Sequence, residues 1–314
     1  MATLIYHNGA LGDFLTTFPL LKFFRSTVTD SISLLGNPSY AQLAKAAGLI
    51  DEILDINNRS YIPLFLDERD KRTVEILKRF DRLLLFAGYD SSLVKNVSQS
   101  GNSEILVHPP FPQNRDIHIV EYHLSLLKQE ISSDFDIFPA FHISSVESDY
   151  VKRLLPDNKP VALLCPGSGS RLKNWPFRNF MDLSVKLKGH GFEVIWITGP
   201  AEYYLRFPEN EIVLSNQSLL TIVTLLKNCS FYIGNDSGVT HLAALSGCRT
   251  IALFGASDPR IWSPVGKEVC VIYKKPHCSP CHLKKVSQES CNMLCMKSIT
   301  VEEVFGIINS QFPK

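Results

Sequence analysis

The stretch that decides the fold reads YIGNDSGVTHLAALSGCRTIALFGASDPR over residues 232–260. It begins with β-branched and aromatic residues, continues through a polar turn and a helix-like segment, and ends with an apolar run and a second polar turn. This order predicts two parallel strands joined by a short helical crossover. Because such units bring the loops after their strands to one edge of the sheet, beside helix N-termini, phosphate groups commonly bind there.

The polar residues of this stretch allow two interpretations. Asp236 and Ser237 can simply cap the helix, as short polar side chains often do, and His241 can be an ordinary surface or core histidine. A cap explains one residue, however, whereas both polar turns fall on the same predicted edge. We therefore take four residues as candidates for ligand binding: Asp236, Ser237, Gly238 and His241.

The overall composition is that of a soluble globular protein with 45% hydrophobic and 20% charged residues. Its 314 residues suffice for two domains, and the break in pattern near residues 145–160 divides them into 1–150 and 151–314. A net charge of +1 gives no general reason to expect a nucleic-acid partner. No apolar run approaches the ~18 residues that span a bilayer, so we expect a cytoplasmic protein with at most peripheral membrane contact.

The first domain opens with a strand over residues 3–7, a glycine-bearing turn, and a helix predicted from Phe14 to about Arg25. The turn lacks the third glycine of a dinucleotide fingerprint, which argues against a nicotinamide or flavin site. Gly12 allows a ligand to approach the backbone, and Asp13 is brought to the mouth of the sheet. Asp13 can equally be a first-turn acid favoured by the helix dipole.

Strands and helices continue to alternate along the first domain. Strands are predicted at 31–35, 52–56, 82–86 and 104–107, and helices at 39–47, 67–80 and 117–128. The basic residues of the segment 67–82 form either a solvated face or a grip on an anionic substrate. Two doubly wound α/β domains follow from this alternation and from the opening stretch.

The second domain has two more polar loops after predicted strands. The strand 161–165 leads into small residues and a lysine, whose free backbone N–H groups and positive charge suit a diphosphate; the candidates are Ser168, Gly169 and Lys173. The Gly-Lys-Ser/Thr order of a Walker motif is missing. After the strand 192–198, Glu202 can accept hydrogen bonds from ribose hydroxyls or be only a first-turn acid.

Four of the eight cysteines are clustered near the end of the chain as Cys-x₂-Cys-x₉-Cys-x₃-Cys, namely Cys278, Cys281, Cys291 and Cys295. Two such pairs can wrap one tetrahedral ion, a structural zinc or iron, and His277 and His282 flank the first pair. Disulfides and free thiols remain alternatives. A metal here would serve the fold of the loop, away from the substrate. A closing helix is predicted at 301–308.

Five motifs occur together in the order of a known family: Ala10-Leu-Gly-Asp13, Pro166-Gly-Ser168 with Lys173-x-Trp-Pro176, Gly199-Pro-Ala-Glu202, Gly234-Asn-Asp-Ser-Gly238 with His241-Leu-Ala, and Leu253-Phe-Gly-Ala-Ser-Asp-Pro259. The chain resembles glycosyltransferase family 9, the ADP-heptose:lipopolysaccharide heptosyltransferases. The resemblance covers nearly the whole chain and is weakest at about 57–112. It implies a GT-B fold, two Rossmann-like domains facing across a cleft, with the acceptor on the first and the nucleotide sugar on the second.

The resemblance also implies an activity and roles. An inverting enzyme would move a heptose or related sugar from an ADP-sugar to a saccharide hydroxyl in lipopolysaccharide-core or related surface-glycan assembly. Asp13 would be the general base and Lys173 would stabilise the leaving diphosphate, with no cofactor required. The implied donor-binding residues are Gly12, Ser168, Gly169, Lys173, Glu202, Asp236, Ser237, Gly238 and His241. A nucleotide-sugar epimerase or hydrolase of the same fold, or a non-catalytic sugar-nucleotide-binding relative, are the alternatives.

Overall fold

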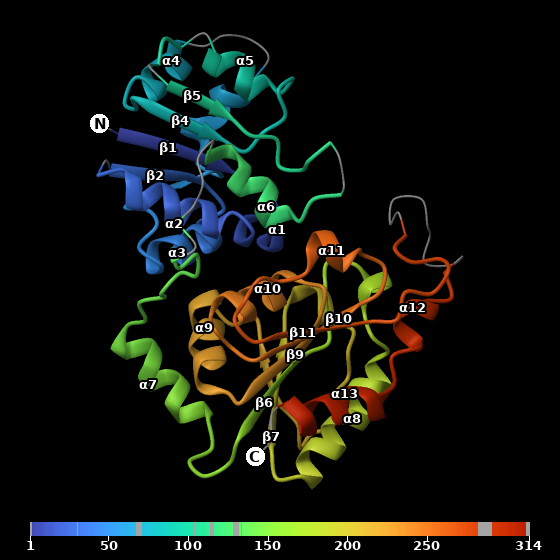
Figure 1. Cartoon of the computed structure of the whole chain (residues 1–314). Helices are drawn as coiled ribbons and strands as arrows, with labels where there is room; N and C mark the ends of the chain where they lie inside the picture. The colour runs from blue at the N-terminus through green and yellow to red at the C-terminus, as the bar shows by residue number, and fades with distance from the viewer. Residues whose placement is uncertain are drawn as a thin grey trace. The chain divides into compact units, whose positions relative to one another are not determined.

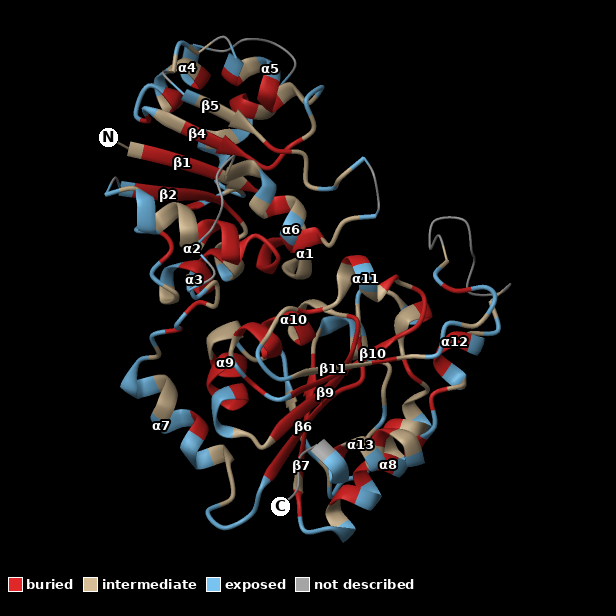
Figure 2. Cartoon of the chain, in the orientation of Figure 1, coloured by how far each residue is buried: buried red, intermediate tan, exposed pale blue. Residues whose placement is uncertain are grey.

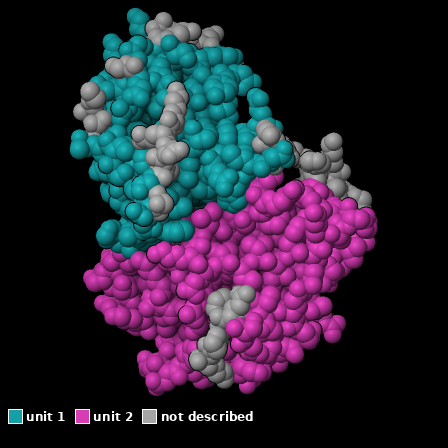
Figure 3. Space-filling view, in the orientation of Figure 1, with its two compact units in different colours: residues 1–142 teal, residues 143–314 magenta. Residues whose placement is uncertain are grey.

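The chain folds into two compact α/β units, residues 1–142 and 143–314, in a computed structural model (Figures 1 and 3). The structure describes residues 2–29, 31–66, 71–98, 100–102, 104–113, 116–127, 132, 134–281 and 291–311. Each unit is built around its own parallel sheet.

Unit 1 contains a five-stranded sheet in the order β3-β2-β1-β4-β5. Every neighbouring pair is parallel. Its strands are β1 (Ala2–His7), β2 (Ser31–Gly36), β3 (Glu52–Asp55), β4 (Arg82–Leu85) and β5 (Glu104–Val107). Its helices are α1 (Leu11–Leu15), α2 (Phe18–Thr27), α3 (Pro38–Ala46), α4 (Lys71–Leu77), α5 (Ser92–Ser98) and α6 (Ile119–Leu124), with 3-10 helices η1 (Arg59–Phe65) and η2 (Ser125–Leu127).

The single helix predicted from Phe14 is in fact two helices, α1 and α2, separated at Thr16 and Thr17. Pro19 lies in the first turn of α2. Because proline has no N–H and clashes with the preceding turn, it is accommodated at the start of a helix and not in its interior. The predicted helix 67–80 is described only from Lys71, since residues 67–70 lie outside the described ranges.

Unit 2 contains a six-stranded parallel sheet in the order β11-β10-β9-β6-β7-β8. Its strands are β6 (Val161–Cys165), β7 (Glu193–Thr198), β8 (Ile212–Ser215), β9 (Phe231–Asn235), β10 (Thr250–Phe254) and β11 (Val269–Tyr273). Its helices are α7 (Ser145–Leu154), α8 (Phe177–Gly189), α9 (Leu219–Asn228), α10 (Gly238–Leu245), α11 (Pro259–Trp262), α12 (Leu294–Lys297) and α13 (Val301–Gln311), with η3 (Arg171–Lys173) and η4 (Pro200–Glu202).

The main core of unit 2 lies between its sheet and the helices α8, α12 and α13. The central strands β6, β9 and β10 are buried along their whole length, which Figure 2 shows as continuous red. Strands covered by helices on both faces carry near-continuous apolar runs, which explains why the sequence predicts them. Helices α9 and α10 pack together on the other face (Figure 1).

Both sheets have the strand order of a doubly wound fold, which confirms the predicted fold class. The order reverses between β1 and β4 in unit 1, and between β6 and β9 in unit 2. At such a switch point the neighbouring loops run in opposite directions and leave a crevice outside the carboxyl ends of the strands, where ligands bind. Among the described residues, no helix combines the length and apolar character needed to cross a bilayer.

Candidate functional site

Two loops meet at the switch point of unit 2 through an ion pair. Lys173, in η3 after β6, places its Nζ 2.7 Å from Oδ2 of Asp236, which directly follows β9. The Ser257 hydroxyl, in the loop after β10, donates a hydrogen bond to the same oxygen. The Asp236 side chain is 8% exposed and that of Lys173 is 24% exposed. Loops after three strands therefore converge on one carboxylate at the edge where doubly wound sheets bind ligands.

The ion pair leaves Lys173 able to bind an anion. An ammonium group has three N–H donors, and the bond to Asp236 uses one of them. The remaining donors are available to phosphate oxygens on the partly exposed side of the amine. Lys173 is therefore both a structural link between two loops and a positive charge at the mouth of the sheet.

Ser237 has the capping role that its sequence position allows. Its hydroxyl oxygen accepts a hydrogen bond from the backbone N–H of Thr240 at 3.3 Å, and α10 begins with Gly238. The first backbone N–H groups of a helix have no partner inside the helix and can bind an anion. His241 lies one turn into α10 and is only 7% exposed.

Asn235 is a site residue that sequence analysis missed. It ends β9, is fully buried, and bonds both ends of the loop that carries Lys173. Its Oδ1 accepts the Trp175 N–H at 2.8 Å, and its Nδ2 donates to the Pro166 carbonyl at 2.8 Å. Because buried amides need such partners, Asn235 fixes this loop to β9. The position of Asn235 between Gly234 and Asp236, in the polar motif after the strand, is the sequence feature that could have indicated its role.

Glu202 comes to the same edge from the loop after β7. A Cβ on Gly167 would lie 1.7 Å from Oε1 of Glu202, so only glycine lets the two loops touch. Oε2 accepts the Gly199 N–H at 2.7 Å, which is also a helix-capping arrangement. Partial burial raises the pKa of Glu202, and the hydrogen bond from Gly199 opposes this shift. Glu202 therefore lies where it could accept hydrogen bonds from ribose hydroxyls, and it also serves as an acid in the first turn of η4.

The loop candidates Ser168 and Gly169 differ in how far neighbouring residues already contact them. The Ser168 hydroxyl lies 2.8 Å from the Ser170 carbonyl and 2.6 Å from Oδ1 of Asn174, so it closes its own turn. Gly169 is exposed, and a Cβ there would meet nothing within 4 Å. The loop can therefore present backbone at Gly169, while the Ser168 hydroxyl must exchange partners to contact a ligand.

Asp13 and Gly12 lie in unit 1, apart in the chain from the other candidates. Asp13 is in the first turn of α1 at the switch point of that unit, and both residues are partly exposed. A Cβ on Gly9 would lie 2.9 Å from Cε1 of His7 and 3.2 Å from Cβ of Asp13. The turn before Asp13 is therefore tight enough to require glycine at this position.

The model of glycosyltransferase family 9 (heptosyltransferase) matches residues 99–292. The chain belongs to this family. Lipopolysaccharide heptosyltransferase 2 of Escherichia coli is 26% identical over 151 residues, which are 43% of this chain and 43% of that protein. Across the first curated relatives the chain spans between 37% and 50% of their length.

Solved structures show the same fold in other family 9 proteins. The glycosyl transferase family 9 protein of Veillonella parvula has a TM-score of 0.79 at 17% identity, covering 99% of this chain and 97% of its own. The ADP-heptose lps heptosyltransferase II of E. coli has a TM-score of 0.75 at 18% identity, covering 99% and 98%. The predicted GT-B fold of two Rossmann-like domains is therefore confirmed for this family 9 chain.

The cysteine-rich segment of this family 9 protein contacts the candidate edge. The Cys281 N–H donates to the Ala256 carbonyl at 2.9 Å, and the Ser279 hydroxyl donates to the Gly255 carbonyl. These two carbonyls immediately precede Ser257, the partner of Asp236. This segment therefore packs against the loop after β10 that carries Ser257.

The four clustered thiols share one neighbourhood. Burial raises the pKa of Cys295, and the charges of Cys281, Cys278 and Cys291 raise it further. None of these four cysteines forms a disulfide. Within the described ranges, no three His, Cys, Asp or Glu side chains gather as an ion would require, and His282 lies outside those ranges. The arrangement described does not form a metal site, and the metal stays a prediction.

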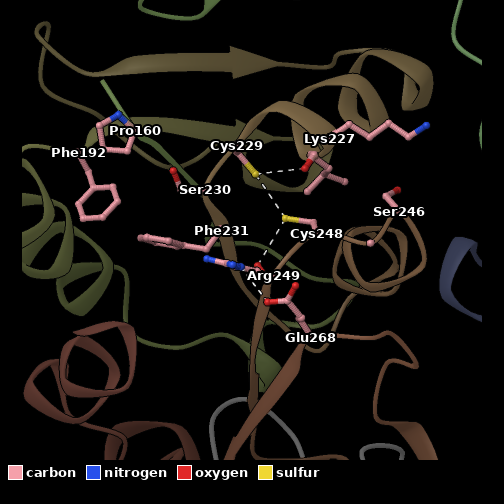
Figure 4. A pocket seen from close by; sticks show the side chains of 12 residues that line it. Pro160, Phe192, Lys227, Cys229, Ser230, Phe231, Ser246, Cys248, Arg249 and Glu268 are labelled. Carbon is pink, nitrogen blue, oxygen red and sulfur yellow. Dashed lines mark hydrogen bonds and ion pairs between the residues drawn. The ribbon is translucent and has the colours of Figure 1, made fainter. Parts of the chain in front are cut away.

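Two hollows lie elsewhere in the family 9 chain. One hollow, in unit 2, has a volume of about 710 Å³, and Figure 4 shows the side chains that line it. It is lined by residues that precede strands, such as Pro160, Ser230 and Arg249, and by the thiols of Cys229 and Cys248, whose sulfurs are 3.4 Å apart. This is the amino edge of the sheet, opposite Asp236, and Arg249 there pairs with Glu268 at 2.8 Å.

The second hollow, in unit 1, has a volume of about 530 Å³. Its lining includes three arginines from η1, α4 and the residues after α4, namely Arg59, Arg72 and Arg79. Glu75 is the acid among the lining residues. The basic residues predicted for the segment 67–82 thus partly line a concave surface.

Proposed function

We propose that this protein is an inverting glycosyltransferase that moves a heptose or related sugar from an ADP-sugar to a hydroxyl of a saccharide acceptor, in lipopolysaccharide-core or related surface-glycan assembly. Family membership supports a sugar transfer, and relatives named for ADP-heptose support the donor class. The observation that carries the proposal is the convergence of the loops after β6, β9 and β10 on the Lys173–Asp236 pair. This is the position at which doubly wound sheets hold nucleotide phosphates.

In the proposed reaction Asp13 is the general base. Its carboxylate takes the proton of the acceptor hydroxyl while that oxygen forms a bond to the anomeric carbon. On the opposite face of the sugar, the bond from the anomeric carbon to the diphosphate oxygen breaks, and the nucleoside diphosphate leaves with the electron pair. The single displacement inverts the anomeric centre. A positioned base typically contributes 10²–10⁴-fold to the rate.

The proposed leaving-group site is in unit 2. Lys173 and the first backbone N–H groups of α10 stabilise the diphosphate where its negative charge grows. Asp236 keeps the lysine oriented, and Glu202 serves the ribose hydroxyls. Lys173 and the N-terminus of α10 supply positive charge without a divalent ion, so the proposed chemistry requires no cofactor.

The proposed acceptor is an anionic saccharide bound by unit 1. Arg59, Arg72 and Arg79 line a concave surface there, and guanidinium groups bind phosphate and carboxylate in a bidentate manner. The basic segment then has a substrate-binding role beyond keeping a helix face solvated.

The replacement Asp13→Asn tests the proposal because it keeps the shape of the side chain and removes its basicity. We expect the rate of sugar transfer to fall by roughly 10²–10⁴-fold. Donor binding, measured separately by calorimetry, should stay within about twofold, since the proposed donor groups in unit 2 are intact. Asp182→Asn is the matched control, because Asp182 is an exposed acid on α8 that pairs only loosely with Arg178, at 3.9 Å.

Two outcomes would contradict the proposal. Full transfer by Asp13→Asn would remove Asp13 from its role. Consumption of an ADP-sugar by the wild-type protein at an unchanged rate without any acceptor would instead indicate a hydrolase or epimerase.

A further inference from the structure

Three buried histidines surround the switch point of unit 1, beside Asp13. His7 ends β1, His108 directly follows β5, and His123 is in α6; they are 5%, 5% and 2% exposed. Each ring contacts that of Phe86, which follows β4, with centroids 5.3 to 5.8 Å apart. Three elements therefore bring one polar cluster to the place where unit 1 is built to bind a ligand.

A chain of hydrogen bonds runs from these histidines to the backbone of Asp13. The Thr16 hydroxyl donates to the Asp13 carbonyl at 2.7 Å. Thr16 Oγ1 is 3.3 Å from Nε2 of His123, and Nδ1 of His123 is 3.1 Å from Nε2 of His108. Sequence spacing gives no hint of this chain, since it joins residues more than 100 positions apart.

The direction of every bond in the chain follows from counting protons. The single proton of the Thr16 hydroxyl is used on the Asp13 carbonyl, so its oxygen must accept from Nε2–H of His123. A neutral imidazole has one N–H, which makes Nδ1 of His123 an acceptor for Nε2–H of His108. Both rings are therefore neutral Nε2–H tautomers.

The surroundings keep the rings neutral, as this pattern requires. Burial lowers the pKa of His108 to about 4 and that of His123 to about 3. The charges of His108 and His7 also lower the pKa of His123. A proton added to Nδ1 of His123 would place its N–H against the Nε2–H of His108.

The turn on the other side of Asp13 is held by the third histidine. The Gly9 N–H donates to Nδ1 of His7 at 3.2 Å, which makes His7 a neutral Nε2–H tautomer as well. Burial lowers the pKa of His7 to about 4. Neutral imidazoles thus tie down the backbone both before and after Asp13.

Neither core packing nor proton transfer accounts for this arrangement. Apolar side chains would fill the same space without the cost of desolvating three polar rings. The chain also ends on a backbone carbonyl, which does not take up a proton at neutral pH, so it is not a proton path to the Asp13 carboxylate. What remains is control over where the Asp13 segment lies.

We propose that His7, His108 and His123 are positioning residues that, through the Gly9 N–H and the Thr16 hydroxyl, hold the Asp13 segment in place for proton removal from the acceptor. The inference rests on the proposed function of Asp13 as the base. A base that is displaced by about 1 Å can lose 10²-fold in rate, so a device that fixes both flanks has a clear use.

Thr16 and its neighbour Thr17 provide a matched test. Thr17 is fully buried and its hydroxyl makes the same kind of bond, to the Phe14 carbonyl at 2.7 Å, but the histidine chain does not pass through it. The replacement by valine keeps the shape of either residue and removes its hydroxyl. We expect Thr16→Val to lower kcat by about 10- to 100-fold with the KM for the donor unchanged. Thr17→Val should keep kcat near wild type, and Thr16→Ser, which retains the hydroxyl, should restore most of it.

Histidine-selective ¹⁵N NMR tests the assigned hydrogen-bond chain directly, and the comparison of kcat with KM tests its positioning role. In the wild-type protein the rings of His108 and His123 should both appear as neutral Nε2–H tautomers at pH 7. Thr16→Val should change the signal of His123, whereas Thr17→Val should not. Wild-type rings that are charged or in the other tautomer would overturn the assigned chain.

The failure of this inference can be told apart from that of the proposed function. Equal kcat values for Thr16→Val and Thr17→Val, together with an inactive Asp13→Asn, would overturn the positioning role and leave the transferase intact. Full transfer by Asp13→Asn would overturn the base itself, and the positioning role with it. The hydrogen-bond chain of the histidines would then have only a structural role in unit 1.

Discussion

Lys173 and Lys188 form ion pairs of the same geometry in different places. Each Nζ lies 2.7 Å from a carboxylate oxygen, of Asp236 for Lys173 and of Glu211 for Lys188. The two lysine side chains are 24% and 30% exposed, and the two acids are 8% and 6% exposed. Only the first pair joins loops at the switch point of unit 2. Geometry alone therefore does not mark a binding site, and location within the sheet does.

This similarity makes Lys188→Ala the control for Lys173→Ala. We expect Lys173→Ala to weaken binding of the nucleotide-sugar donor by about tenfold or more, because a hydrogen bond to a charged group is worth about 1.5–3 kcal/mol. Lys188→Ala should leave donor binding within about twofold, although it breaks a similar pair. Calorimetric titration of both variants measures the difference. Equal affinities would show that Lys173 only links its loop to Asp236.

The sequence reveals some site residues and hides others for physical reasons. Lys173, Asp236 and Glu202 lie in the loop segments that follow the apolar strands β6, β9 and β7, so the strand pattern predicts their position at the edge of the sheet. Asn235 ends β9, but an asparagine next to a polar turn is common and does not reveal its buried bonds. The histidines come from three separate elements, and only the folded chain brings them together.

At the scale of elements, the strands of unit 1 and the central strands of unit 2 are found close to their predicted bounds, whereas the edge strands of unit 2 were not predicted. The predicted strand 161–165 is found with the same bounds as β6, because it is buried throughout. The edge strand β8 has four residues with exposed ends, and its signal is correspondingly weak. The edge strand β11, VCVIY, carries an apolar signal, although no strand was predicted there. The break between α1 and α2 was missed because Pro19 was not used as a helix boundary.

The cysteine-rich segment links the end of β11 to α12 and contacts the loop after β10. If its four thiols bind a structural ion, elemental analysis of the purified protein should find about one zinc or iron per chain. Cys278→Ser should then remove the metal. Cys270→Ser is the control, because Cys270 lies within β11 outside the cluster and its replacement should leave the metal in place. A wild-type protein without stoichiometric metal would dismiss the hypothesis.

At the scale of the whole molecule, the two units respond differently to acid. The histidines with lowered pKa values, about 3 to 4, are in unit 1. In the unfolded chain they would take up protons near pH 6.5. In unit 2 the pKa of Glu202 is raised by burial, so its folded form binds a proton more readily than its unfolded form. Hydrogen bonds from Arg260 lower the pKa of Asp258 in unit 2, so the stability it contributes is lost only below about pH 4.

The sign of the histidine effect follows directly. Above pH 6.5 the rings are neutral in both states and contribute nothing to the pH dependence. Between about pH 6.5 and 4 the unfolded state binds protons that the folded state does not, so the free energy of unfolding of unit 1 falls. Each such proton contributes up to about 1.4 kcal/mol per pH unit. We therefore expect unit 1 to unfold at a higher pH than unit 2.

The tryptophans allow the two transitions to be separated, since Trp175, Trp196 and Trp262 all belong to unit 2. Far-UV circular dichroism reports both units, so its signal should begin to fall at a higher pH than tryptophan fluorescence changes. His108→Gln keeps an amide that can donate to His123 and removes one titrating ring. It should move the first dichroism transition to lower pH and leave the fluorescence midpoint where it was. Coincident transitions, or an unmoved first transition in His108→Gln, would show that the neutral histidines do not set the acid stability of unit 1.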